Sequence, residues 1–321
     1  MALESTPMAV TGGEHSAQMF RMMVRDLARG NQGITEGAHL KVTALSTPGA
    51  GVQIADGSAV IKGVFSPVQG HYSVYNIGSD TVAIGATGGT PRSDMLILRV
   101  QDPDYEGTLD PSESAFFDVV TNVSSSATTV PSGYSAIPLA RIDIPASTAT
   151  ITNAMIVDLR QVANPRRERL LLPYYAADPL VEISGTSETW KTHPALPSAS
   201  PAGEMFEVPI PAWAAQAKVV FSVDGLRLVD GNVFGGFRFM LGTKEAGQYV
   251  GIDDNQGSPP RRIPVRMAET ISLTDTAGAA MRGTTQSFYS RMRTRSTNAG
   301  KIGVDGTTTF IADIEFTEGP L

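Results

Sequence analysis

The segment TPRSDMLILRVQDPDYEG, residues 90–107, decides the fold class of this chain. Its centre, Met95–Val100, is almost continuously apolar, which predicts a strand that is covered on both faces. On either side along the chain, short runs rich in Val, Ile and Tyr alternate with Gly, Asp and Pro. Such runs are typical of strands separated by turns, so the sequence predicts a mainly β protein.

Length and composition suggest two β-rich domains. The 321 residues include 32 Gly and 21 Pro, and 18% of them are charged. A chain of 321 residues is longer than most single domains, and the many glycines and prolines favour short strands with many turns. We expect a β domain with one helix at 1–163, a connector at 164–179, and a jelly-roll-like β-sandwich at 180–321. Within the sandwich, Asp224-Gly225 between two apolar runs predicts a hairpin.

Charge and cysteine content argue against several classes of protein. The net charge of −7 is unfavourable for nucleic-acid binding, which needs Lys and Arg against phosphates. The chain has no cysteine, so disulfides, thiolate metal sites and cysteine nucleophiles are excluded. The first twenty residues lack a signal-peptide pattern, and no apolar run reaches about 18 residues. We therefore expect a soluble protein without membrane insertion.

One amphipathic helix is predicted near the start of the chain. Ser16 is a suitable N-cap and Gly30 a suitable stop. Between them the apolar residues recur every three or four positions: Met19, Phe20, Met23, Val24 and Leu27. Their common face packs either on its own domain or against a neighbouring subunit.

Motifs for catalysis or cofactor binding are missing from the sequence. The histidines His15, His39, His71 and His193 are scattered, and neither H-E-x-x-H nor a phosphate-binding loop occurs. We therefore expect no enzyme, no cofactor and no metal. The acidic loop residues Asp102, Asp104, Glu106 and Asp110 offer oxygen ligands for Ca²⁺, but they lack the EF-hand glycine and glutamate, and a solvated loop is the preferred interpretation. Trp190 and Trp213 are expected in a core or interface, with sugar stacking as the alternative.

The first half carries an ordered series of short motifs. These are DGSAVIKG at 56–63, GHYSVYNIGSDTVAIGA at 70–86, the segment at 90–107, IPLARIDIPA at 137–146 and ATITNAMIVDLR at 149–160. Their order resembles the N-terminal, baseplate-attaching domain of siphophage tail proteins, including the minor tail proteins of phages that infect actinobacteria. The resemblance covers residues 50–165 and leaves the helix and the second half outside it.

The resemblance implies charged residues at fixed places in the domain. An Arg-x-Asp step opens the buried strand, an acidic loop leaves it, and a late Asp-x-Arg closes the domain. The matching residues are Arg92 and Asp94, Asp102 and Asp104, and Asp158 and Arg160. We expect cross-strand ion pairs that fix the order of the sheet, or else an arginine that faces a partner subunit.

The leading functional hypothesis is a structural component of a bacteriophage tail tip or baseplate. Such a protein is made in the host cytoplasm and becomes part of the virion. It is expected to form a homo-oligomer, preferably a trimer, and to bind other tail proteins. The alternative is a receptor-binding adhesin whose sandwich recognises a host surface glycan, and an enzyme that degrades surface polysaccharide ranks third. Apolar residues expected at subunit interfaces are Met19, Met23, Leu170, Leu171, Leu172, Tyr174 and Tyr175.

A basic strip marks the second half. Seven arginines lie between residues 261 and 295, against two acidic residues. If this stretch is a strand, Arg291, Arg293 and Arg295 share one face with Tyr289, and Met292 points the other way. Three interpretations stay open: solvated arginines, a subunit contact, or a site for an anionic host polymer such as a teichoic acid.

Overall fold

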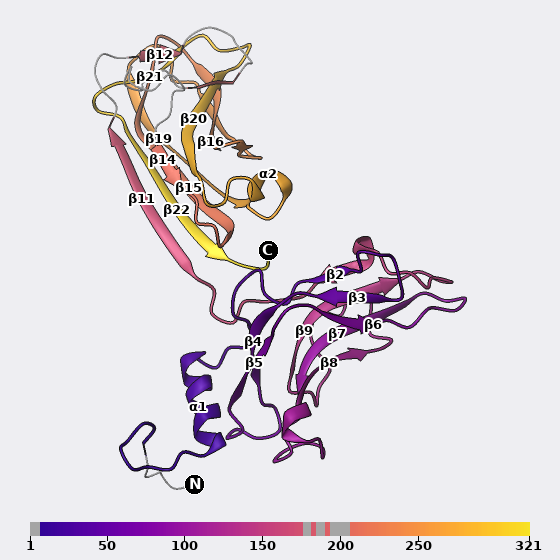
Figure 1. The fold of residues 1–321 in the computed structure, drawn as a ribbon. Helices are drawn as coiled ribbons and strands as arrows, with labels where there is room; N and C mark the ends of the chain where they lie inside the picture. Colours follow the sequence, from indigo (N-terminus) through magenta and orange to yellow (C-terminus); the bar gives the residue numbers. More distant parts are fainter. Residues whose placement is uncertain (1–6, 176–180, 184–189, 193–205) are drawn as a thin grey trace. The chain divides into compact units, whose positions relative to one another are not determined.

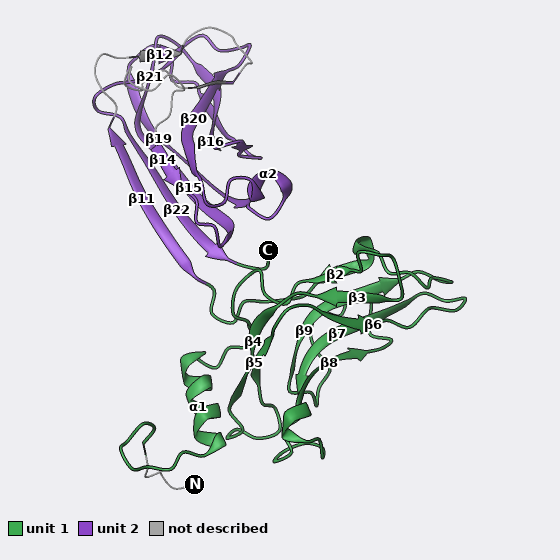
Figure 2. Cartoon of the chain, in the orientation of Figure 1, with its two compact units in different colours: residues 1–165, 319–321 green, residues 166–318 purple. Residues whose placement is uncertain are grey.

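The computed structural model describes residues 7–175, 181–183, 190–192 and 206–321 (Figure 1). The chain divides into two compact units (Figure 2). Unit 1 is Met1–Pro165 with Gly319–Leu321, and unit 2 is Arg166–Glu318. Both consist largely of antiparallel sheets, and the predicted mainly β fold is confirmed. No helix of the described ranges is long and apolar enough to cross a membrane.

Unit 1 contains helix α1 (Ala17–Leu27) and three small sheets. The first sheet has the order β1 (Gly33–Ile34), β4 (Gly57–Lys62), β5 (His71–Asn76). The second has β2 (Val42–Ala44), β3 (Gly51–Ile54), β6 (Asp80–Ala83). The third has β10 (Ile156–Asp158), β9 (Ala136–Ile144), β7 (Arg92–Val100), β8 (Ala115–Val120). Short 3-10 turns occur at Pro111–Glu113 and Asn153–Met155.

Strand β7 is the centre of unit 1. Leu96 and Leu98 on one face lie in the larger hydrophobic core, and Met95 and Ile97 on the other face lie in a smaller one. Both faces of the strand are thus covered, as the continuous apolar run predicts.

In the residues that the structure describes, unit 2 is a sandwich of two six-stranded sheets. One sheet has the order β11 (Arg167–Tyr175), β22 (Thr309–Glu318), β15 (Ala214–Val229), β21 (Lys301–Val304), β12 (Val181–Ile183), and β19 (Arg261–Ser272) also pairs with β15. The other has β13 (Lys191–Thr192), β20 (Thr285–Thr294), β16 (Val233–Leu241), β17 (Lys244–Glu245), with β14 (Phe206–Pro209) on β20 and β18 (Val250–Asp254) on β16. A one-turn helix, α2 (Thr276–Ala279), precedes β20.

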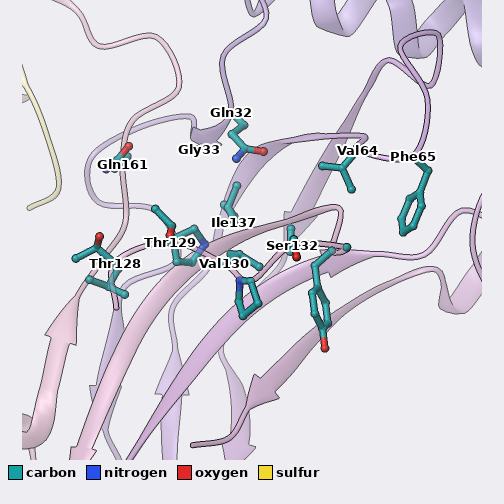
Figure 3. A pocket seen from close by; sticks show the side chains of 16 residues that line it. Gln32, Gly33, Val64, Phe65, Thr128, Thr129, Val130, Ser132, Ile137 and Gln161 are labelled. Carbon is teal, nitrogen blue, oxygen red and sulfur yellow. The ribbon is translucent and has the colours of Figure 1, made fainter. Parts of the chain in front are cut away.

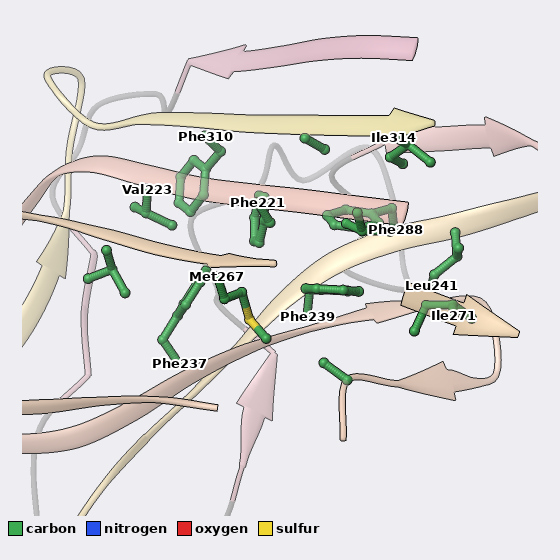
Figure 4. Packing of buried hydrophobic residues seen from close by; sticks show 14 of the residues in the cluster. Phe221, Val223, Phe237, Phe239, Leu241, Met267, Ile271, Phe288, Phe310 and Ile314 are labelled. Atoms are coloured by element: carbon green, nitrogen blue, oxygen red, sulfur yellow. The ribbon is translucent and has the colours of Figure 1, made fainter. Parts of the chain in front are cut away.

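Phenylalanines from both sheets fill the interior of the sandwich (Figure 4). Phe221 of β15 stacks on Phe237 of β16 with 5.3 Å between ring centroids. Phe288 of β20 contacts the Phe221 ring edge-on, with 5.0 Å between centroids. These aromatic contacts hold the two sheets together.

The predicted connector at 164–179 differs from the structure at residues 167–175, which form strand β11, and its residues 176–179 lie outside the described part of the chain. This strand pairs along its whole length with β22, from Arg167 opposite Thr317 to Tyr175 opposite Thr309. Three adjacent leucines hide the two-residue alternation, and Pro173 is unusual in a strand. The proline is tolerated because β11 is the edge of its sheet.

The predicted hairpin at Asp224-Gly225 is wrong. Strand β15 continues through both residues to Val229, and the pairing with β19 shifts register between Val223 and Leu226. Gly225 has φ +76°, which is the left-handed conformation that a bulge requires. The strand does not fold back here because β19 pairs with it on both sides of the bulge.

Candidate interaction surfaces

Helix α1 turns its apolar side to solvent. Its N-cap is Ser16, whose hydroxyl accepts a hydrogen bond from the Met19 amide at 3.2 Å. No residue of the helix is buried, and Phe20, Met23 and Leu27 are 49%, 39% and 72% exposed. At spacings of three and four, these three side chains form one stripe, the α1 stripe.

A buried arginine holds the opposite side of the helix against unit 1. The Arg21 guanidinium pairs with Asp102 at 3.0 Å, and the two side chains are only 11% and 10% exposed. Its Nε donates to the Gln69 carbonyl at 2.8 Å. The guanidinium also lies over the rings of Tyr72 and Tyr105, at 5.7 and 5.4 Å from their centroids.

This arrangement corrects the interpretation in which the apolar face packs on its own domain. Arg21 occupies the inward side, and the stripe is left uncovered by the described part of unit 1. Met23 belongs to the exposed stripe, whereas Met19 is partly covered.

The acidic loop helps to hold helix α1 against unit 1, through Asp102. The Asp102 carboxylate accepts from the Tyr72 hydroxyl at 2.7 Å in addition to its pair with Arg21. Burial, together with the hydrogen bond to Asp102, raises the pKa of Tyr72 well above its usual range. Glu106 pairs with Arg99. Among the described residues, no cluster of three or more His, Asp or Glu could hold a metal ion.

Arg92 and Asp94 form an ion pair at 2.8 Å, and Asp94 is completely buried. The Asp94 carboxylate also accepts from the backbone amide of Asn122, in the turn after β8, at 3.0 Å. The pair is formed by neighbours two residues apart on β7, not across strands. The expected cross-strand link comes instead from this backbone hydrogen bond.

Arg160 gathers distant backbone segments. It pairs with Asp158 at 2.8 Å, again two residues away, and its side chain has no exposed surface. Its guanidinium donates to the backbone oxygens of Gly37 and Leu321, both at 3.2 Å. Arg160 therefore fixes residues 319–321 to unit 1, and a buried position excludes it from a partner-facing role in this structure.

The predicted interface residues on β11 divide into two groups. Leu170, Leu172 and Tyr174 pack on the sandwich core of their own unit. Leu171 and Tyr175 alternate with them and are exposed. Only the second group remains available to a partner, because alternate residues of a strand point to opposite faces.

Unit 1 also has an open apolar groove of about 530 Å³ (Figure 3). Val64, Phe65, Val130 and Ile137 contribute to its lining, and the first two residues are about half exposed. No sequence pattern indicated this groove, since its residues come from separate loops and strands.

The basic strip is partly neutralised within unit 2. Arg291 and Arg293 share the outer face of β20 with Tyr289, while Met292 is buried, as strand alternation predicts. Arg295 lies just beyond the end of the strand and is exposed. Arg291 pairs with Glu245 at 2.7 Å and donates to the Trp190 carbonyl at 3.0 Å.

Residues of β16 and β17, together with the rings of Trp190 and Tyr249, complete a cluster around these arginines. Arg238 of β16 is directly opposite Arg291 and also pairs with Glu245. Its guanidinium lies 4.0 Å from the centre of the Trp190 ring. Arg293 lies 4.7 Å from the same ring and 4.9 Å from the ring of Tyr249. We call this the cationic-aromatic cluster: Trp190, Arg238, Glu245, Tyr249, Arg291 and Arg293.

A glycine makes room for the two rings. Gly236 is opposite Arg293, and a side-chain carbon there would lie 3.0 Å from the Tyr249 ring and 3.1 Å from Trp190. The rings meet at an angle of 70° with 5.6 Å between centroids. Burial lowers the pKa of Arg238, and the nearby charges of Arg291 and Arg293 add to this decrease against the opposing effect of Glu245.

Trp213, the second tryptophan, takes no part in this cluster. It packs on the sandwich core and lies under the Arg166 guanidinium, 5.7 Å from its ring centre. Trp213 therefore has the expected core position, whereas Trp190 lies with Arg238 and Arg293 on the outer face of its sheet.

Comparison with known proteins provides little guidance. No protein-family model and no curated protein sequence matches this chain. Among solved structures, the chain is similar to infectious bursal disease virus, Gx strain, at 10% identity and a TM-score of 0.26, covering 90% of this chain and 67% of that one. The VP2 subviral particle of the same virus matches at 12% identity and a TM-score of 0.23, covering 90% and 79%. These scores are too low to establish a shared fold.

Proposed function

We propose that this chain is a non-catalytic structural component of a bacteriophage tail tip or baseplate, which assembles with itself through α1. The exposed α1 stripe carries the proposal. Arg21 fixes the polar side of the helix to unit 1, so the apolar side is held outward. An ordered apolar stripe on a monomer surface is typical of a contact with another chain.

The spacing of the stripe supports a second copy of the same chain as the partner. Phe20, Met23 and Leu27 are three and four residues apart, which is the seam spacing of helices that pack side by side. Identical helices around a rotation axis can bury the same stripe against itself. A trimer is preferred because the ordered motifs of residues 50–165 resemble siphophage tail proteins, and tail-tip fibres in such proteins usually surround a threefold or sixfold axis.

Mass measurement by light scattering of the full chain at micromolar concentration tests the assembly. We expect three times the 33.9 kDa of the single chain. A Met23→Gln, Leu27→Gln double variant should give the single-chain mass. Ile77→Gln, which changes an exposed apolar residue elsewhere in unit 1, is the matched control and should leave the oligomer intact.

A monomer in the unchanged protein, or an oligomer unaffected by the double variant, would refute assembly through α1. Place in the particle is tested separately. An antibody raised against unit 2 should label the tail tip of intact virions, and labelling of the head alone would exclude a tail role.

A second candidate function is attachment to the host through unit 2. The cationic-aromatic cluster favours it, because charged and aromatic side chains gather there on the outer face of a rigid sheet. An adhesin of this kind could belong to the same tail structure, so the two candidates are compatible.

A further inference from the structure

We propose that the cationic-aromatic cluster binds an anionic sugar or polyol polymer, with guanidinium groups on the phosphate or carboxylate and aromatic rings on the carbon skeleton. This inference rests on the second candidate function above, attachment through unit 2. It goes further by naming the site and the chemical class of ligand.

The charge of the cluster is not balanced by its own residues. The cluster has three guanidinium groups but one carboxylate, that of Glu245, which pairs with Arg238 and Arg291. Arg293 forms no ion pair among the residues that the structure describes, and its Nε is buried without a hydrogen-bond partner there. The Nε of Arg238 is also without one. A bound anion would give Arg293 the ion pair that these residues do not supply.

The aromatic rings give the site a second kind of contact. Tyr249 is 43% exposed, and Trp190 beside it is partly exposed. Sugar and polyol chains present C–H groups that pack on aromatic faces, while their phosphates or carboxylates need cationic partners. Both kinds of group lie within one cluster, which a nonspecific basic surface would not require.

The paired strands and the hydrogen bond to Trp190 hold the cluster in place. Arg238 and Arg291 are opposite each other on paired strands, and Trp190 is anchored by the hydrogen bond from Arg291 to its carbonyl. Gly236 leaves the space that the rings occupy. A preorganised site of this type loses little conformational entropy on binding.

Binding of defined polymers to the full chain, measured by calorimetry at low salt, tests the inference. The probes are poly(glycerol phosphate), polygalacturonate, neutral dextran and dextran sulfate. We expect binding of at least one of the first two, no binding of neutral dextran, and weakening as salt rises. Preference for the phosphate or for the carboxylate polymer identifies which anion the site takes, and either result supports the proposal.

Matched variants assign the binding to the cluster. Arg293→Gln should weaken binding at least tenfold, whereas Arg266→Gln, an exposed arginine of β19 on the other sheet, should change it less than twofold. Tyr249→Ala should weaken binding at least threefold and, since its ring is exposed, should not prevent folding. If Arg293→Gln melts at a lower temperature than the unchanged protein, the binding of Tyr249→Ala decides whether the cluster is the binding site.

Absence of binding to both anionic polymers would overturn the proposal, as would equal losses in Arg293→Gln and Arg266→Gln. If dextran sulfate bound more tightly than both poly(glycerol phosphate) and polygalacturonate, and Tyr249→Ala left that binding unchanged, the site would attract anions by charge alone. This result would also overturn the proposal. None of these outcomes bears on the assembly through α1, which is measured by mass.

Discussion

Replacing Arg21 with glutamine should loosen helix α1 from unit 1 and lower the free energy of unfolding of that unit by about 2–3 kcal/mol. The change leaves the Asp102 carboxylate, 10% exposed, without its cationic partner. It also removes the hydrogen bond from Arg21 to the Gln69 carbonyl.

The magnitude follows from the degree of burial. Removing one partner of a fully buried ion pair costs about 3–5 kcal/mol, and exposed pairs contribute about 0–1 kcal/mol. The pair between Arg21 and Asp102 lies near the buried limit, but Asp102 keeps the Tyr72 hydroxyl and the Asp104 amide as donors. These two hydrogen bonds, with the small remaining exposure, place the expected loss at or just below the lower end of the range for a fully buried pair.

Urea unfolding, together with amide hydrogen exchange in α1, measures the effect. Exchange in residues 17–27 should become faster in Arg21→Gln. The control is Arg25→Gln on the same helix, whose pair with Asp26 is exposed and should contribute under about 0.5 kcal/mol. In a double-mutant cycle, Arg21→Gln and Asp102→Asn should be coupled by about 1–3 kcal/mol. Equal losses in the Arg21 and Arg25 variants, or no coupling, would refute the claim that this pair holds the helix.

Three further changes test the second unit. Phe221→Ala should lower the free energy of unfolding by about 3–5 kcal/mol, seen as a lower urea midpoint, because the lost ring stacks on Phe237 and is completely buried. Gly225→Ala should cost about 1–3 kcal/mol, since φ is +76° and the new carbon would lie 2.6 Å from a backbone carbonyl oxygen; an unchanged melting temperature would contradict the bulge. The Arg262 guanidinium, together with the hydrogen bonds from Thr307, lowers the pKa of the Asp305 carboxyl from 3.8 to about 2, so these contacts stabilise the fold above pH 3.8 and their contribution is lost as the pH falls towards 2. Asp305→Asn should therefore cost about 1 kcal/mol at pH 7 and much less at pH 2, and an equal cost at both would show that the carboxylate charge is not involved.

Local patterns in the sequence determined the strands and the helix. The apolar run of β7 predicted a strand covered on both faces, and Ser16 and Gly30 predicted the two ends of α1 within a few residues. These features depend on near neighbours, through side-chain alternation, capping and the left-handed conformation that glycine allows.

Tertiary structure decided which partner each side chain meets. The apolar pattern of α1 could not show that Arg21, on the same helix, would find Asp102 and turn the stripe outward. Strand β11 was missed because its alternation appears only when Leu170 and Leu172 are seen to face the core and Leu171 the solvent.

The candidate site was the least accessible to sequence analysis. Strand alternation placed Arg291 and Arg293 on one face, but Trp190 is 101 residues away from Arg291 in the chain and Arg238 is on another strand. The sheet brings them together because pairing between β16 and β20 fixes which residues are opposite one another. A sequence specifies the alternation within each strand, whereas only the register between strands determines that these charges and rings meet.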